Sequence, residues 1–371
     1  MTKDVIVLDG GRRIRLVSPK DDREQIVSAR WLFDHADEAR EPASGQRRHG
    51  ALDLEDALVL RAGLEGDRLV AHFASGVRSL ALARLPTARP ASSELALWPT
   101  PELCTACAPV DFSAYLADDA ALAEALSRVA RFGLVLLSGA GDDPGAVERA
   151  VERFGFIRET NYGRLFDVRV EAEPSNFAFT ERALDLHGDN PYRDPVPTLQ
   201  LLHAIKADDA GGGETLFVDG FAHAEALRRE RPAAFEILAR EPVRFTFREA
   251  SGAAWSARYP ILETDGAGGL RAVRVNHRSL DLELRDAEGQ DAWYDAYLDL
   301  YRRLHAPGTA FERRLQPGEF VIFDNRRLLH GRRAYARGGA RWLRGAYADC
   351  DGLHATLARL QAGAPGSGAI A

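Results

Sequence analysis

The stretch from residue 184 to residue 195 reads Leu184-Asp-Leu-His187-Gly-Asp189-Asn-Pro-Tyr-Arg-Asp-Pro195. Side chains two positions apart in an extended chain project from the same side, so His187 and Asp189 can both reach one metal ion. A second histidine, His330, stands far downstream, after Phe323-Asp-Asn-Arg-Arg-Leu-Leu. Two imidazoles and one carboxylate on one face form the facial triad of non-haem Fe(II) oxygenases. Taken singly, each histidine is more simply interpreted as an ordinary residue at the end of a strand.

These three ligands leave three coordination positions of an iron ion open. A bidentate 2-oxo acid can occupy two of them and O2 the third, so one ion gathers the electrons needed to cleave O2. A zinc hydrolase needs only one open position. The set of His187, Asp189 and His330 therefore predicts an Fe(II) site that uses a 2-oxo acid and O2.

An anionic co-substrate needs a fixed cation, and arginine offers a planar fork that matches a carboxylate. Arg341 lies eleven residues after His330, and the segment Ala336–Ala340 predicts a turn between them. Such a turn would fold two adjacent strands into a hairpin, with Arg341 facing the same cavity as His330. Arg344 is an odd number of positions from Arg341 and would point the other way. Thr215 follows a run of glycines and could add a hydroxyl, although a glycine turn into a strand explains that segment equally well.

The composition excludes several classes of protein. A formal net charge of -7 leaves no basic surplus to neutralise phosphates, so no nucleic-acid partner is expected. The first residues show no signal peptide, and no apolar run is long enough to cross a bilayer. Three cysteines are too few for a disulfide scaffold, and their odd number fits a reducing compartment. We therefore expect a cytoplasmic globular protein with neither nucleic acid nor membrane as partner.

The sequence pattern divides the chain into three parts. Residues 1–90 contain short apolar stretches between turn residues and predict a small β-rich domain. Residues 91–110 are rich in proline and predict a linker. Residues 111–371 predict a larger domain of strands and helices. Within it, the spacing of apolar residues predicts a buried strand at 132–138 and helices at 118–131, 145–154, 220–229, 232–240 and 291–305.

Several segments together resemble the γ-butyrobetaine dioxygenases, within a wider group that includes trimethyllysine dioxygenase and taurine dioxygenase. Trp31-Leu32 and Ser44-Gly-Gln-Arg47 extend the similarity into the N-terminal part. The other segments that carry the resemblance are Leu186–Pro197, Leu199–His203, Val218–Phe221, Phe323–Tyr335 and Gly345–Asp349.

The resemblance implies a fold and a reaction. The fold is mainly β with flanking helices: a double-stranded β-helix (jelly-roll) core beside a small N-terminal β domain, in a homodimer. His187, Asp189 and His330 would bind Fe(II), and Arg341, helped by Thr215, would bind the distal carboxylate of 2-oxoglutarate. The reaction would couple oxidative decarboxylation of 2-oxoglutarate, to succinate and CO2, with hydroxylation of a small trimethylammonium acid.

The resemblance also implies a pocket for that small-molecule substrate. A quaternary ammonium has no N–H to donate, so aromatic ring faces hold it best. Asparagine side chains would meet the anionic end of the substrate. The alternative is that the aromatic residues only pack in the core. The residues implied are Tyr162, Phe166, Asn176, Phe179, Asn276 and Tyr347.

This chain departs from the family pattern at two places. Relatives tend to show consecutive asparagines where it has Asn276-His277-Arg278, and the added cation suits either a carboxylate or a phosphonate. Relatives also carry a cysteine-rich zinc cluster where it reads His35-Ala-Asp-Glu-Ala-Arg-Glu-Pro42. No structural zinc is therefore expected. Cys104 and Cys107 have half of a zinc-knuckle spacing, but two packed thiols are the simpler interpretation.

Three hypotheses about function follow. The first is an Fe(II)- and 2-oxoglutarate-dependent hydroxylase of a γ-butyrobetaine-like acid. The second is a hydroxylase of 2-(trimethylamino)ethylphosphonate or another small acid, with the same iron chemistry. The third is a non-catalytic, small-molecule-binding relative that has kept the fold. The complete set of His187, Asp189, His330 and Arg341 speaks against the third, because the loss of any one would abolish the chemistry.

Overall fold

The chain folds into two compact units, Met1–Ala91 and Ser92–Ala371. The computed structural model describes residues 5–17, 24–85, 95–102, 108–169, 182–207, 211–249, 251–283, 286–334 and 341–362. Cys104, Cys107 and the expected turn at 336–340 lie outside these residues.

The N-terminal unit contains two three-stranded antiparallel sheets. Strand β2 alternates between buried and more exposed side chains, as a short strand with one solvated face does. Leu32 and Phe33 of helix α1 pack into the same apolar cluster as the buried strand residues. The elements are β1 (Val5–Leu8), β2 (Arg13–Val17), β3 (Glu24–Ser28), α1 (Ala29–His35), β4 (Val59–Glu65), β5 (Arg68–Phe73) and β6 (Gly76–Ala81).

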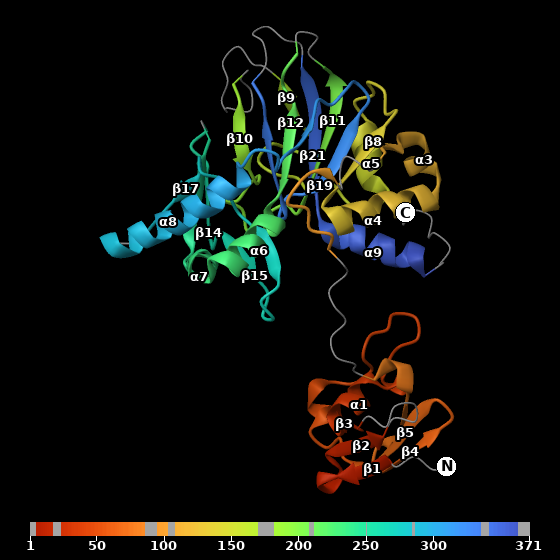
Figure 1. The fold of residues 1–371 in the computed structure, drawn as a ribbon. Helices are drawn as coiled ribbons and strands as arrows, with labels where there is room; N and C mark the ends of the chain where they lie inside the picture. Colours follow the sequence, from red (N-terminus) through yellow and green to blue (C-terminus); the bar gives the residue numbers. More distant parts are fainter. Residues whose placement is uncertain are drawn as a thin grey trace. The chain divides into compact units, whose positions relative to one another are not determined.

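Two sheets form the centre of the second unit (Figure 1). The larger sheet has the order β7-β8-β19-β11-β21-β9, antiparallel except for the β7–β8 pair, and the smaller has the antiparallel order β10-β20-β12-β18. The strands of the larger sheet are β7 (Val110–Asp111), β8 (Leu134–Ser138), β9 (Phe166–Arg169), β11 (Leu199–Lys206), β19 (Phe320–Asp324) and β21 (Trp342–Ala348). Those of the smaller are β10 (Leu184–His187), β12 (Thr215–Asp219), β18 (Phe311–Arg313) and β20 (Leu328–Arg332).

The central strands β8, β11 and β19 are buried on both faces, and their sequences are therefore almost continuous apolar runs. Successive side chains point to opposite faces, so Leu134 and Leu136 of β8 pack with Phe217 of the smaller sheet. Val135 and Leu137 of the same strand pack instead against helices on the outer face. One core thus lies between the sheets, and a second lies under the helices.

Four helices cover that outer face: α3 (Phe112–Ala117), α4 (Asp119–Phe132), α5 (Ala146–Glu152) and α9 (Cys350–Gln361). The Asp118 side chain caps α4 by accepting hydrogen bonds from the Ala120 and Ala121 amides. The helix ends at Gly133, whose φ of 87° lies in the left-handed region. A Cβ there would also lie 3.1 Å from Leu328, so glycine is required before β8.

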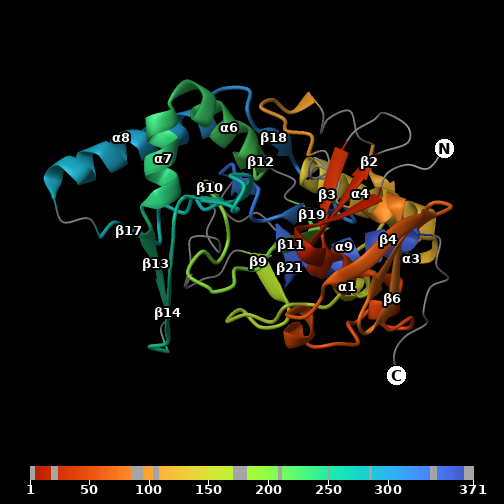
Figure 2. The same cartoon turned by 90° about the horizontal axis from the view of Figure 1, so that it is seen from below.

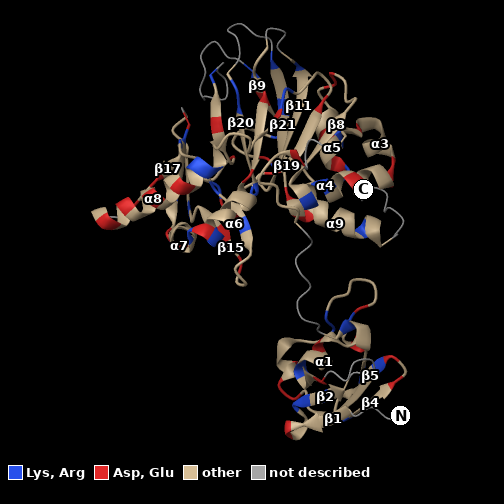
Figure 3. Cartoon of the chain, in the orientation of Figure 1, with Lys and Arg blue, Asp and Glu red and all other residues tan. Residues whose placement is uncertain are grey.

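Helices α6 (Gly220–Glu230), α7 (Pro232–Arg240) and α8 (Ala287–Leu304) pack with Leu186, Val218 and Leu329 of the smaller sheet. In Figure 2 the β13–β14 hairpin extends from the foot of α7. Along α8, acidic residues lie at the N-terminal end and arginines at the C-terminal end (Figure 3), which complements the helix dipole. The remaining strands are β13 (Val243–Arg248), β14 (Ala254–Tyr259), β15 (Leu262–Thr264), β16 (Leu270–Val273) and β17 (Leu280–Asp281).

The expected elements appear, and two details differ. Helix α8 begins at Ala287 rather than Asp291, because the Asp286 side chain caps it by accepting from the Gly289 amide. The expected hairpin between the strands of His330 and Arg341 is wrong. Strand β20 belongs to the smaller sheet, whereas β21, which begins just after Arg341, belongs to the larger. The prediction of a β-rich core with flanking helices is confirmed. In the part of the chain that the structure describes, no helix is long and apolar enough to span a membrane.

Candidate active site

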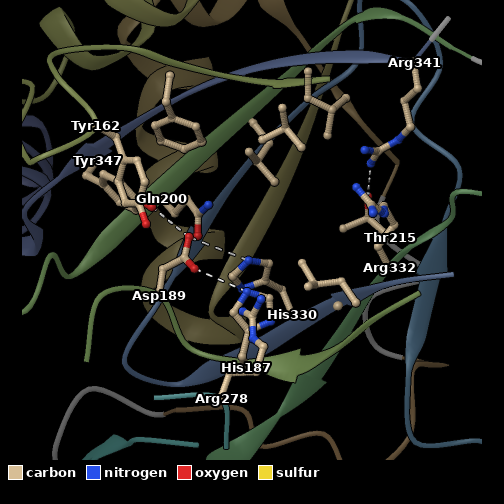
Figure 4. Close-up of a pocket in the computed structure, with 16 residues that line it drawn as sticks. Tyr162, His187, Asp189, Gln200, Thr215, Arg278, His330, Arg332, Arg341 and Tyr347 are labelled. Carbon is tan, nitrogen blue, oxygen red and sulfur yellow. Dashed lines mark hydrogen bonds and ion pairs between the residues drawn. The ribbon is translucent and has the colours of Figure 1, made fainter. Parts of the chain in front are cut away.

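Strand pairing brings the two histidines together. His187, at the end of β10, lies directly opposite His330 of β20, and the centroids of their rings are 4.3 Å apart. Asp189 follows β10, with its Oδ1 3.3 Å from Nε2 of His187 and its Oδ2 3.9 Å from Nε2 of His330 (Figure 4). One ligand atom from each residue lies within 4.8 Å of the others, which is close enough for all three to bind one ion.

The protonation states in this cluster suit a metal. Nδ1 of His187 donates a 2.7 Å hydrogen bond to the Asp185 carbonyl, which leaves Nε2 free of its proton and aimed at the cluster. Burial and the neighbouring His187 lower the pKa of His330 to about 3, so its imidazole is neutral. Burial raises the pKa of Asp189, but its contacts with His187, His330 and the Tyr347 hydroxyl outweigh burial and lower it. Two imidazoles and one carboxylate are the donor set that divalent iron takes.

Two buried amides hold the loop that carries Asp189. The backbone N–H of Asp189 donates to Oδ1 of Asn325 at 2.7 Å, and Nδ2 of Asn325 returns a bond to the Asp189 carbonyl at 3.0 Å. Nδ2 of Asn276 donates to the Gly188 carbonyl at 3.0 Å. Asn276 was expected at the anionic end of the substrate, but its side chain lies behind this loop and is not among the described residues that line the pocket. Its described hydrogen bond holds the Gly188 backbone, and its expected role at the substrate stays a prediction.

One pocket contains the cluster and most of the other expected site residues (Figure 4). Asn176 and Phe179 lie outside the described residues, so their positions remain predictions. The expected residues that line the pocket are Tyr162, Phe166, His187, Asp189, Thr215, His330, Arg341 and Tyr347.

One end of the pocket is cationic. Arg341 is buried and its Nη2 donates to Oγ1 of Thr215 at 3.4 Å. The buried Arg332 also lines this end, directly opposite Thr215 in the β12–β20 pair. Arg344 points away as expected, since its guanidinium binds both carboxylate oxygens of Asp167. Arg332 was not among the residues predicted for the site, although it stands two positions after His330 in one strand and therefore shares its side.

The other end of the pocket is aromatic. Phe166 stacks on Tyr347 with centroids 5.0 Å apart, and Tyr162 lies 6.5 Å from Phe166. Gly345 permits this packing, because a Cβ there would lie 2.5 Å from the Phe166 ring. The Tyr347 hydroxyl donates to Oδ2 of Asp189 at 2.8 Å, and burial together with the Asp189 charge raises its pKa, so it remains a donor.

Two further polar residues line the pocket without having been singled out as site residues. Gln200 of β11 is 2% exposed, and its Oε1 has no hydrogen-bond partner among the described residues. Arg278 is exposed at the pocket and has no ion pair in the part of the chain that the structure describes. Gln200 stands in the otherwise apolar run Leu199-Gln-Leu-Leu, and that break in the pattern was its only signal.

The fold and the site define a class. Residues 96–347 match the family model "Taurine catabolism dioxygenase TauD, TfdA family", and the chain belongs to this family. The resemblance inferred from the motifs is thereby confirmed, and the cluster of His187, Asp189 and His330 has the ligand set of the iron-dependent dioxygenases within that class.

Among particular relatives, γ-butyrobetaine dioxygenase of Pseudomonas sp. (strain AK-1) is 39% identical over 252 residues, 68% of this chain and 65% of the relative. The human γ-butyrobetaine dioxygenase is 34% identical over 247 residues, 65% of this chain and 64% of the relative. The mitochondrial trimethyllysine dioxygenase of Bos taurus is 30% identical over 244 residues, 64% of this chain and 57% of the relative. The chain thus spans less than two thirds of the length of these curated relatives.

Among solved structures, an asparagine oxygenase in complex with Fe(II), hydroxyasparagine and succinate matches with a TM-score of 0.50 and 20% identity. The match covers 64% of this chain and 82% of that chain. It supports the fold.

Proposed function

We propose that this protein is an Fe(II)- and 2-oxoglutarate-dependent hydroxylase of a small trimethylammonium acid, similar to γ-butyrobetaine. The observation that carries the proposal is one pocket in which the His187–Asp189–His330 cluster lies between a cationic end and an aromatic end. Each end fits one of the two organic reactants, and the ligand cluster lies between them.

His187, Asp189 and His330 would hold the iron. When bound, Fe(II) with 2-oxoglutarate and O2 supplies the oxidising power for hydroxylation, while 2-oxoglutarate is decarboxylated to succinate and CO2. The chain itself orients the ligands. The Asp185 carbonyl fixes His187, and the Tyr347 hydroxyl together with the Asn325 amide fixes Asp189.

At the cationic end, Arg341 would bind the distal carboxylate of 2-oxoglutarate. Its guanidinium is buried, so the pair would form in a region of low dielectric, where a charge-assisted hydrogen bond is strong. Thr215 would both position Arg341 and donate its own hydroxyl. Arg332 adds positive charge on the same side and would favour a dianion over a monoanion.

At the aromatic end, Tyr162, Phe166 and Tyr347 would surround the trimethylammonium group. Ring faces attract a cation that has no N–H to donate, and packing on three sides keeps water out. The names of the relatives, γ-butyrobetaine dioxygenase and trimethyllysine dioxygenase, support a substrate of this class.

The finer architectural predictions belong to the same proposal. They are a jelly-roll core in residues 111–371, a β-rich domain in 1–90 joined to it by a linker at 91–110, a homodimer, a cytoplasmic location, and the absence of a structural zinc. The two sheets of the second unit and their shared core support the jelly-roll. The homodimer rests on the resemblance alone.

A second candidate is hydroxylation of a trimethylammonium phosphonate. Arg278 favours it, because this exposed guanidinium lines the pocket and has no carboxylate partner among the described residues. A phosphonate can carry a second negative charge, so it would interact with the Arg278 guanidinium more strongly than a carboxylate does.

Succinate release, measured with a panel of betaines and phosphonates, tests the proposal. Fe(II)-loaded protein should release succinate with γ-butyrobetaine or 2-(trimethylamino)ethylphosphonate, and mass spectrometry should find a product heavier by one oxygen. Taurine, which lacks the methyl groups, is the control. Turnover with taurine alone would overturn the substrate class, and no turnover with any compound despite bound iron would favour the non-catalytic hypothesis.

A further inference from the structure

Tyr162 lines the aromatic end of the pocket from the tip of a tight turn (Figure 4). Thr160 and Gly163 form an isolated antiparallel bridge, in which the backbone N–H of each donates to the carbonyl of the other, at 3.2 and 3.0 Å. Asn161 and Tyr162 are therefore the two residues at the tip. The tip of a turn has few contacts of its own and moves more readily than a strand. A ring in such a place needs support from elsewhere in the fold.

Two neighbouring residues of the segment that follows Asp189 hold both tip residues. The hydroxyl oxygen of Tyr192 lies 3.2 Å from that of Tyr162. The Arg193 guanidinium donates twice to Oδ1 of Asn161, from Nε at 3.1 Å and from Nη2 at 2.7 Å. Tyr192 is buried and is not among the described residues that line the pocket. It therefore supports the pocket wall without forming part of it.

The two hydroxyl groups form a hydrogen-bond chain with one direction. Burial raises the pKa of the Tyr162 and Tyr192 phenols, so each keeps its single proton. Tyr192 donates its proton to Oδ1 of Asn190 at 2.8 Å. The Tyr192 oxygen can then only accept, and Tyr162 is the donor to it. Because its backbone and its phenolic oxygen are both held, the Tyr162 ring cannot swing out of the wall.

The β13–β14 hairpin braces the same two rings. Phe247 of β13 stacks on Tyr192, with centroids 5.0 Å apart and planes inclined by 16°, and its centroid lies 6.1 Å from that of Tyr162. Trp255, the directly opposite residue on β14, lies 5.3 Å from the Arg193 guanidinium. Aromatic pairs of this kind add stability beyond the area that they bury. The Tyr192 ring thus has a support that does not depend on its hydroxyl.

We propose that Tyr192 is a positioning residue whose hydroxyl holds the Tyr162 ring in the aromatic wall, and so sets the affinity for a trimethylammonium group that Tyr192 itself does not touch. This inference rests on the proposed function and adds a specificity determinant to it. A ring attracts a cation when its face lies within about 6 Å of the charge. A Tyr162 ring that is free to swing loses part of this attraction, whereas its apolar contacts with a neutral ligand depend less on its angle.

Binding without turnover tests the inference. The protein is loaded with Ni(II) and saturated with 2-oxoglutarate, and calorimetry gives the Kd of γ-butyrobetaine and of its neutral analogue, in which carbon replaces the nitrogen. The ratio of the two values isolates the effect of the positive charge. Tyr192→Phe keeps the ring that stacks on Phe247, and it should reduce the preference for the cation about twofold to fivefold. Tyr294→Phe, at an exposed position outside the pocket, is the matched control and should leave the ratio unchanged.

A double-mutant cycle shows whether Tyr192 acts through Tyr162. Tyr162→Phe keeps the ring but removes the same hydrogen bond, so adding Tyr192→Phe to it should change the ratio little further. Equal effects of Tyr192→Phe in the wild type and in the Tyr162→Phe background would overturn the inference, because Tyr192 would then act independently of that ring. A loss confined to the affinity for Ni(II) would also contradict it, since the hydroxyl would then act through the loop of Asp189.

The wild type separates this inference from the proposed function. If the wild type shows no preference for the cation, the proposed substrate class and the inference both fail. If the wild type prefers the cation and a folded Tyr192→Phe variant, with a Tm near that of the wild type, keeps the same preference, only the inference fails. A preference that falls in Tyr192→Phe, and falls little further when that change is added to Tyr162→Phe, supports both.

Discussion

The hydroxyl of Tyr347 donates a 2.8 Å hydrogen bond to Oδ2 of Asp189, and so connects the aromatic end of the pocket to a ligand of the candidate metal site. The same ring stacks on Phe166. A movement of the Phe166 or Tyr347 ring would therefore displace the Asp189 carboxylate, whose other oxygen faces His187. We therefore expect ligand binding in this pocket and the geometry of the ligand cluster to be coupled through Tyr347.

Asp189→Ala should abolish turnover and weaken metal binding by at least tenfold, because it removes the only anionic ligand of the cluster. Titration with Fe(II) under anaerobic conditions and succinate release measure the two effects. Asp185→Asn is the matched control, since that side chain bonds to Tyr301 and His305 instead of the cluster. Near wild-type hydroxylation by Asp189→Ala would show that the metal site is elsewhere.

Arg341→Met should raise the KM for 2-oxoglutarate about tenfold or more, with a much smaller effect on the KM for the prime substrate. A charge-assisted hydrogen bond to a carboxylate contributes about 1.5–3 kcal/mol. Arg344→Met is the control, because Arg344 pairs with Asp167 and points away from the pocket. Similar increases in the KM for 2-oxoglutarate in the two variants would contradict the assignment of Arg341 as the residue that binds its carboxylate.

Arg278→Gln should weaken binding of an anionic substrate about threefold to thirtyfold, and a phosphonate more than the matching carboxylate. Arg271→Gln removes a comparably exposed arginine outside the pocket and should change neither affinity. Calorimetry with γ-butyrobetaine and 2-(trimethylamino)ethylphosphonate measures the difference. If both ligands bind Arg278→Gln as tightly as wild type, Arg278 takes no part in recognition.

The hydrogen bond between His305 and Asp185 predicts pH-dependent stability. Burial lowers the pKa of His305, but the 2.6 Å bond to Asp185 outweighs burial and raises it above 6.5. Burial raises the pKa of Asp185, but bonds from His305 and Tyr301 lower it from 3.8 to about 2. The raised pKa of His305 stabilises the folded state fully below pH 6.5, and this stabilisation is lost as the pH rises above that value. The lowered pKa of Asp185 stabilises the folded state fully above pH 3.8, and this stabilisation is lost as the pH falls below that value. The pair therefore stabilises the fold most between these values.

Thermal unfolding at pH 5.5 and pH 8.5 checks this expectation. His305→Gln should lower Tm by about 1–3 °C at the lower pH and by less at the higher, since the pair is partly exposed. His354→Gln, at an exposed position, should shift Tm equally at both. An equal shift for His305→Gln at the two pH values would mean that the ion pair contributes nothing.

Elemental analysis should find iron and no stoichiometric zinc in protein purified without chelator. In the N-terminal unit, the candidate ligands have other partners: His49 bonds to Asp34, and His35 to the Trp31 carbonyl. Cys104 and Cys107 lie outside the described residues. A zinc that persists after the iron site is emptied, and that is lost on changing both cysteines, would contradict the prediction.

Local spacing was enough to predict the parts of the site that depend on one strand. His187 and Asp189 are two positions apart, which predicted that their side chains lie together. Arg341 and Arg344 are three positions apart, which predicted that their side chains point to opposite sides. Helix α7 has the predicted bounds, because Pro232 fixes its first residue and Arg240 precedes the turn into β13.

Features that depend on sheet membership could not be predicted. Arg341 reaches the cavity from the larger sheet and His330 from the smaller, and no local pattern distinguishes this arrangement from a hairpin. The family resemblance alone implied that Asn276 binds the substrate, and that role stays a prediction. Only the fold shows that its amide contacts the backbone at Gly188.

The order of strands in the two sheets has a consequence for synthesis on the ribosome. The late strands β19, β20 and β21 each lie between two strands that are made much earlier, such as β10 and β12 on either side of β20. Until these strands emerge, both sheets expose unpaired inner edges that can pair with other chains. The second unit should therefore fold only after nearly all of it has been translated, and slowly, because its pairings are distant in sequence. A chain that stops before Leu328 should aggregate rather than fold into a smaller stable domain.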